Sequence, residues 1–161
     1  MARLVKVSNF WWGCGATLIS RQHVLTAAHC VVENGDSRQI VFPASRFAID
    51  LGEHDLTKST AKRFSISKIT PIPEYMVGRH VSHYDIAIVT LSSPVTFSRN
   101  ISPVCLPADT RENHAGQDAV TTGWGLTESE RPSMVLKEAD VKIVTNRFCN
   151  QAYGATNRFI R

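Results

Sequence analysis

Short alternating or apolar runs, separated by turn residues, make up most of this chain. Residues 46–51 alternate between apolar and polar side chains, and a second run at residues 64–69 ends at Pro71. Residues 86–91 form a nearly continuous apolar run of strand length, which predicts a strand buried on both faces. Residues 135–144 alternate again. Many short strands at this spacing predict a β-sandwich or a β-barrel.

Helix is expected in only two places. Residues 27–31 are enough for a single turn. A second, short helix is expected to begin at Thr145 or Asn146, either of which suits the N-cap, and to end at Gly154. The polar and proline-containing stretch 102–116 is suited to linking two β-rich halves.

Composition and charge exclude several classes of function. The chain has 161 residues, of which 43% are hydrophobic, enough for one globular domain with a core. The net charge is +4, but the 18 basic residues are scattered, which argues against a nucleic-acid-binding protein. No apolar run approaches the ~18 residues of a membrane-spanning helix, so no membrane partner is expected. The first residues alternate and contain no apolar signal core.

The cysteines favour disulfides over metal ligation. The four cysteines contain no Cys-x-x-Cys pair, so most structural zinc sites are excluded. Disulfides in an oxidising compartment are the better interpretation, although an even number does not require that all four pair with one another. A zinc site remains an alternative despite its unusual spacing, and its ligands would be Cys14, His23, His29 and Cys30.

His29 and Asp85 are the candidates for chemistry. His29 follows an apolar strand and adjoins Cys30, and a bridge from Cys14 would fix the backbone beside it. A general base needs such fixation. Asp85 directly precedes the apolar run, where a carboxylate needs a partner, and an imidazole N–H is a good one. From the residue types alone, two alternatives remain open: His29 is a structural histidine, and Asp85 is a turn-forming residue.

Five stretches resemble, in the same order, motifs of the chymotrypsin/trypsin-like serine protease family. The resemblance continues through residues 136–149 and so covers essentially the whole chain. It implies an all-β fold of two antiparallel six-stranded β-barrels, in which residues 1–108 supply the first barrel and the interbarrel connection. Residues 109–161 would form an incomplete second barrel. The five stretches are CGATLIS (14–20), VLTAAHC (24–30), DIAIVTL (85–91), ISPVCLP (101–107) and TGWG (122–125).

The resemblance implies a secreted serine endopeptidase in which His29 acts as base and then acid, and Asp85 orients it. The family's nucleophile lies in a Gly-Asp-Ser-Gly-Gly turn, which would follow Arg161. The similar Gly35-Asp36-Ser37 comes just after His29 and lacks the glycines, so we expect it to be a surface turn. Residues 1–161 alone are therefore expected to be inactive and aggregation-prone. The alternative is a non-catalytic protease homologue that binds or regulates partners.

The resemblance also suggests partners and modifications. Polypeptide substrates are expected, and protein inhibitors and a light chain tethered through Cys105 are further candidates. Cys149 would pair with a cysteine beyond Arg161. Asn100-Ile101-Ser102 is an acceptor sequence for N-glycosylation. No cofactor is expected, since residues 52–55 resemble the start of the trypsin calcium loop but residues 58–63 are neutral or basic.

Overall fold

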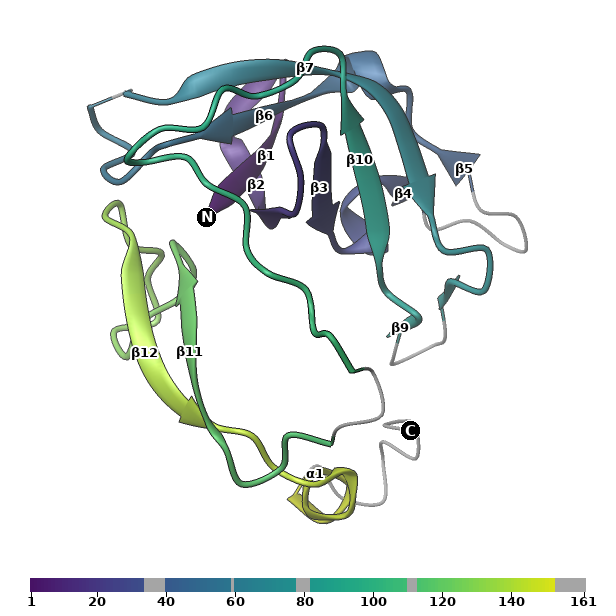
Figure 1. Cartoon of the computed structure of the whole chain (residues 1–161), viewed down its shortest axis with the longest axis vertical. Coiled ribbons are helices and arrows are strands. Elements are labelled where there is room, and N and C mark those ends of the chain that lie inside the picture. The colour runs from purple at the N-terminus through teal and green to yellow at the C-terminus, as the bar shows by residue number, and fades with distance from the viewer. Residues whose placement is uncertain (34–39, 59, 78–81, 110–112, 153–161) are drawn as a thin grey trace.

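The computed structural model describes residues 1–33, 40–58, 60–77, 82–109 and 113–152 (Figure 1). Short β-strands dominate it, as the sequence pattern predicts. The strands are β1 (Ala2–Lys6), β2 (Asn9–Leu18), β3 (His23–Thr26), β4 (Val32–Glu33), β5 (Ile40–Val41), β6 (Phe47–Leu51), β7 (Lys62–Pro71), β8 (Met76–Val77), β9 (Ser82–His83), β10 (Ala87–Leu91), β11 (Asp118–Gly123) and β12 (Lys137–Lys142).

Six of these strands close into an antiparallel barrel in the order β1-β2-β3-β10-β7-β6 (Figure 1). Closure pairs every strand on both sides and leaves no sheet edge exposed. This confirms the predicted all-β class and the first barrel. Two small ribbons, β4-β5 and β8-β9, lie outside the barrel order.

The interior of the barrel is filled by alternate side chains of its strands, because successive residues of a strand point to opposite faces. Burying such an aliphatic side chain stabilises the fold by about 1.5–3 kcal/mol relative to leaving it exposed. The largest fully buried side chains are Leu4, Ile49, Leu51, Leu91, Val5, Val24, Val31, Val89 and Val95.

The prediction that the apolar run 86–91 is buried on both faces is wrong. Ala87, Val89 and Leu91 are fully buried, but Ile86 is 43% and Ile88 39% exposed. The reason is that β10 is one strand of a closed barrel, and only one of its faces points toward the interior. No described segment covers its outer face completely.

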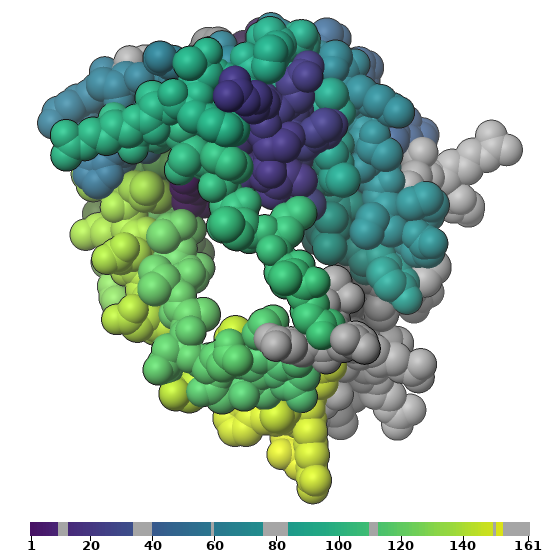
Figure 2. Space-filling model, in the orientation of Figure 1, coloured from purple at the N-terminus to yellow at the C-terminus, as the bar shows by residue number. Residues whose placement is uncertain are grey.

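Strands β11 and β12 form a separate hairpin. Figure 2 shows an opening through the molecule, bordered by the connection that follows the barrel and by this hairpin. Hydrogen bonds join the connection between β11 and β12 to the loop after β6, where the indole of Trp124 and the amide of Leu136 both donate to the carbonyl of His54. Large apolar side chains of the hairpin and its connecting loop are exposed, including Val120 at 60% and Leu126 at 74%.

Both expected helical segments are present, although the expected end of the second at Gly154 lies outside the described residues. The first is a 3₁₀ turn, η1 (Ala28–Cys30), and the second is α1 (Asn146–Ala152). Thr145 is the N-cap of α1, since its hydroxyl accepts the amide N–H of Phe148 at 3.1 Å. A second 3₁₀ turn, η2 (Ala44–Arg46), was not expected. No helix within the described residues has the length and apolarity to cross a membrane.

Candidate active site

The pairing of β3 with β10 brings His29 and Asp85 together. The last residue of β3, Thr26, lies opposite the first residue of β10, Ala87. In an antiparallel pair, the residues that follow one strand lie beside the residues that precede the other. His29 in η1 and Asp85 thus meet at one end of the barrel, although 56 positions separate them in the sequence.

The Asp85 carboxylate contacts His29 at two points. Its Oδ1 accepts the backbone N–H of His29 at 2.8 Å, and its Oδ2 lies 2.7 Å from the ring Nδ1. A carboxylate only accepts hydrogen bonds, so this contact places the proton on Nδ1. The side chain of His29 is 53% exposed and that of Asp85 is 28% exposed. The carboxylate therefore fixes both the orientation and the tautomer of a ring that solvent and a substrate can reach.

The other ring nitrogen of His29 is available for proton transfer. Its Nε2 lies 3.4 Å from Sγ of Cys30, but this sulfur belongs to a disulfide and has no proton to donate. Within the described part of the chain, no hydroxyl group hydrogen-bonds to the ring. With Nδ1–H held by Asp85, Nε2 can accept a proton from a group that approaches from the open side.

A disulfide between Cys14 of β2 and Cys30 of η1 fixes the backbone beside His29. Both sulfurs lie close to the ring, and the three potential ligand atoms are within 4.8 Å of one another. A disulfide supplies no thiolate, however, and thiolate is the form of cysteine that binds zinc. The fourth proposed ligand, His23, instead has its Nδ1 2.8 Å from the Ser20 hydroxyl. This arrangement argues against the zinc alternative.

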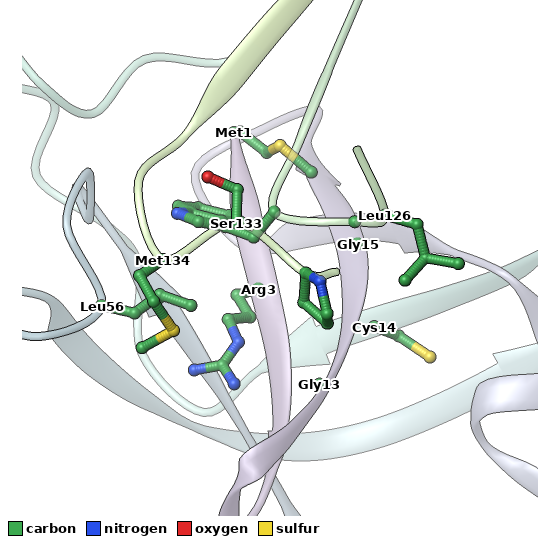
Figure 3. Close-up of a pocket in the computed structure, with 12 residues that line it drawn as sticks. Met1, Arg3, Gly13, Cys14, Gly15, Leu56, Leu126, Ser133 and Met134 are labelled. Atoms are coloured by element: carbon green, nitrogen blue, oxygen red, sulfur yellow. The ribbon is translucent and has the colours of Figure 1, made fainter. Parts of the chain in front are cut away.

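A cavity of about 460 Å³ opens behind this disulfide (Figure 3). Strands β1 and β2 form one wall, and the segments around Trp124 and Ser133 form the other. Its lining is mostly apolar, and Arg3 is the charged side chain among the lining residues. Burial lowers the pKa of Arg3, an effect that the nearby Asp50 carboxylate opposes. The Arg3 side chain lies across Gly13, where a Cβ atom would fall 2.5 Å from its Nε.

The loop that follows β6 uses its carboxylates internally. Glu53 accepts hydrogen bonds from the Thr60 hydroxyl at 2.8 Å and from the Ala61 amide at 3.1 Å. Asp55 accepts the Thr57 hydroxyl at 2.6 Å. Both carboxylates thus accept hydrogen bonds from residues of the loop itself.

Among the described residues, the other candidates Asn100, Cys105 and Cys149 form no hydrogen bond or ion pair with His29 or Asp85. Asn100 is exposed in a tight turn closed by the Ser98–Ile101 bridge. Cys105 is exposed, Cys149 is partly buried, and neither forms a disulfide among the described residues. The Gly35-Asp36-Ser37 segment lies outside the described residues.

Sequence reasoning missed a buried ion pair in the barrel wall. Asp50 is only 5% exposed and accepts two hydrogen bonds from Arg63, both 2.7 Å long. The two residues lie directly opposite each other on β6 and β7. Opposite charges on cross-strand neighbours stabilise a sheet, but this signal can be used only when the register is known.

The comparison with known proteins agrees with this geometry. The family described as Trypsin matches residues 2–161, and the chain belongs to this family. The proclotting enzyme of Tachypleus tridentatus is 35% identical over 147 residues, which are 87% of this chain and 38% of that protein. A venom serine protease of Polistes dominula is 33% identical and covers 96% of this chain, which in turn covers 54% of that protein. Transmembrane protease serine 11C of Mus musculus is 37% identical over 88% of this chain, which spans 31% of that protein. The chain thus spans about a third to a half of the length of these relatives.

Proposed function

We propose that this chain provides the general base and its orienting carboxylate in a serine endopeptidase that acts outside the cell. The observation that supports this most strongly is the two-point contact of Asp85 with His29, which leaves Nε2 of an exposed imidazole free to take a proton. The relatives named above are proteases, clotting or venom enzymes among them. The disulfide is consistent with an oxidising, extracellular environment.

In the proposed reaction, His29 Nε2 removes the proton from a serine hydroxyl as its oxygen attacks the peptide carbonyl carbon. The tetrahedral oxyanion is stabilised by backbone N–H groups, and Asp85 stabilises the imidazolium without becoming protonated. His29 then gives its proton to the leaving amine, which forms the acyl-enzyme. A water molecule, deprotonated by His29, attacks the acyl carbon, the ester bond to the serine breaks, and His29 returns the proton to the serine oxygen as the acid is released. The serine and the oxyanion hole would come from sequence beyond residues 1–161.

The substrates would be polypeptides, which approach the face that carries His29 and the disulfide. The mostly apolar cavity behind Cys14 offers a concave surface on which a peptide segment can rest. Protein inhibitors of the substrate-like kind would compete for this face. The exposed, unbridged Cys105 is suited to a disulfide with a light chain.

A second candidate is a non-catalytic homologue that keeps the fold and binds partners. The exposed apolar side chains of the β11-β12 half favour an association of some kind. Retention of a complete His–Asp pair favours the enzyme, since a binding protein has no need of an oriented base.

Hydrolysis of a peptide ester tests the proposal, measured on the intact protein from its natural source and on variants of the full-length protein. We expect hydrolysis that falls by about six orders of magnitude in His29→Ala, because the base is lost while the fold remains. His54→Ala is the matched control, since His54 is an exposed histidine outside the pair, and its activity should be unchanged. Absence of hydrolysis in the intact natural protein, or equal rates in His29→Ala and His54→Ala, would instead favour the binding homologue. By the same proposal, residues 1–161 alone should show no hydrolysis.

A further inference from the structure

Tyr84, directly before Asp85, has an unusual backbone conformation. Its φ angle is +53°, in the left-handed region. This region suits glycine and is disfavoured for a bulky side chain such as tyrosine. Only one other non-glycine residue in the described chain, Glu130 with φ +56°, shares it.

The surroundings of Tyr84 show what imposes this conformation. Strand β9 ends at His83 and β10 begins at Ala87, so only three residues connect the two strands. The carbonyl of Tyr84 accepts the amide N–H of Ile86 at 2.7 Å, which closes a tight turn around Asp85. The carbonyl of Ile86 in turn accepts the amide of Ile72 at 3.0 Å, which anchors the far side of the turn.

The side chain of Tyr84 does not account for the conformation. Tyrosine 84 is 61% exposed, so packing of its ring contributes little to holding the backbone there. Disfavoured backbone conformations persist where the surrounding structure dictates them, and they occur often at active sites. The turn is centred on the residue whose two carboxylate oxygens must reach the amide and the ring of His29 together.

We infer that Tyr84 is a positioning residue: its left-handed backbone directs the Asp85 carboxylate to His29. The inference rests on the proposed function only where it assigns a catalytic purpose to the His29–Asp85 pair. The contacts within the pair are observed in the structure. It predicts that the φ preference at position 84, and not the tyrosine ring, determines how well the pair is formed.

The experiment follows the ring N–H proton of His29 by NMR in the purified protein. This proton should be protected from exchange with water through its hydrogen bond to Asp85, and Asp85→Asn defines the spectrum of a broken pair. Tyr84→Gly and Tyr84→Phe should keep the protected proton, since glycine accepts the left-handed region and phenylalanine keeps the ring. In Tyr84→Val the proton should exchange at least about fivefold faster, because a β-branched residue resists positive φ.

Glu130 provides the matched control. It has the same backbone conformation but lies in the connection between β11 and β12, where its amide donates to the carbonyl of Thr127. Glu130→Val should impose the same backbone conflict and leave the His29 proton unchanged. If Tyr84→Val does not fold, the comparison of Tyr84→Gly with Tyr84→Ala decides, because both lack the ring and only glycine accepts positive φ freely.

Three results would overturn the inference. One is a protected proton in a folded Tyr84→Val protein, and another is equal exchange in the glycine and alanine variants. The third is loss of the proton in Tyr84→Phe or Tyr84→Gly, since the hydroxyl or the ring of Tyr84 would then carry the effect. A failure of the proposed function remains distinguishable, because loss of peptide-ester hydrolysis does not alter this NMR signal.

Discussion

Replacing Asp50 with asparagine tests the buried ion pair of the barrel wall. The substitution keeps the size of the side chain and removes its charge. Asp50 accepts two hydrogen bonds from Arg63, each 2.7 Å long, and its own side chain is 7% exposed against 44% for Arg63. The neighbouring Arg3 is also attracted to this carboxylate, while burial lowers the pKa of Arg3. Without the negative charge of Asp50, the guanidinium groups of Arg3 and Arg63 both lose the carboxylate that attracts them.

The size of the effect follows from these exposures. Breaking a fully buried pair by removing one partner costs about 3–5 kcal/mol, and a hydrogen bond to a charged group is worth about 1.5–3 kcal/mol. Water can replace part of the interaction at Arg63, because its side chain is almost half exposed. We therefore expect Asp50→Asn to lower the free energy of unfolding by about 2–3 kcal/mol.

Equilibrium urea unfolding at low protein concentration measures this loss. The chain offers a matched control in Asp118, whose carboxylate lies 2.7 Å from Lys142 but whose side chain is 84% exposed. Asp118→Asn should cost at most about 0.5 kcal/mol, since surface ion pairs contribute little. If the two substitutions cost the same free energy, distance and not burial sets the strength of these pairs, and the reasoning is refuted.

Two further predictions concern the disulfide and the loop after β6. Replacing Cys14 and Cys30 together with serine should lower the free energy of unfolding by about 3 kcal/mol, because the bridge closes a loop of 16 positions; a change below about 1 kcal/mol in urea unfolding would contradict this. Hydrogen bonds from the Thr57 hydroxyl and amide, assisted by Lys58, lower the pKa of Asp55. The resulting stabilisation should therefore be fully present above the unfolded-state pKa of Asp55 and be lost as the pH falls through its folded value. Thr57→Ala should raise the pKa of Asp55 toward its ordinary value in an NMR titration of the carboxylate, and an unchanged titration would show that the hydroxyl is not the main cause.

Local sequence patterns predicted many of the strands and turns, because these patterns are properties of neighbouring residues. Alternation and turn residues located most of β6, β7, β10 and β12, and the capping residue Thr145 predicted the start of α1. The pattern could not tell whether β10 is covered on one face or on both. An apolar run is compatible with either arrangement, and only closure of the barrel leaves Ile88 on the outer wall.

The candidate site divides in the same way. The residue types and motifs around His29 and Asp85 were enough to select both residues and to suggest the bridge from Cys14. Their distance was not, since 56 positions separate them and the pairing of β3 with β10 sets how they meet. The left-handed conformation of Tyr84 had no signal in the sequence, because tyrosine is not a residue that prefers positive φ.

The sequence by itself determined the strand-rich class of this protein, its trypsin-like motifs, and the two side chains that carry its candidate chemistry. Each of these depends on residue identity and short-range spacing. Only the tertiary structure decided the barrel closure, the two-point contact of Asp85 with His29, the buried Asp50–Arg63 pair and the turn at Tyr84. The physical reason is that strand register and chain direction are set by contacts between distant segments, and no local window of residues contains that information.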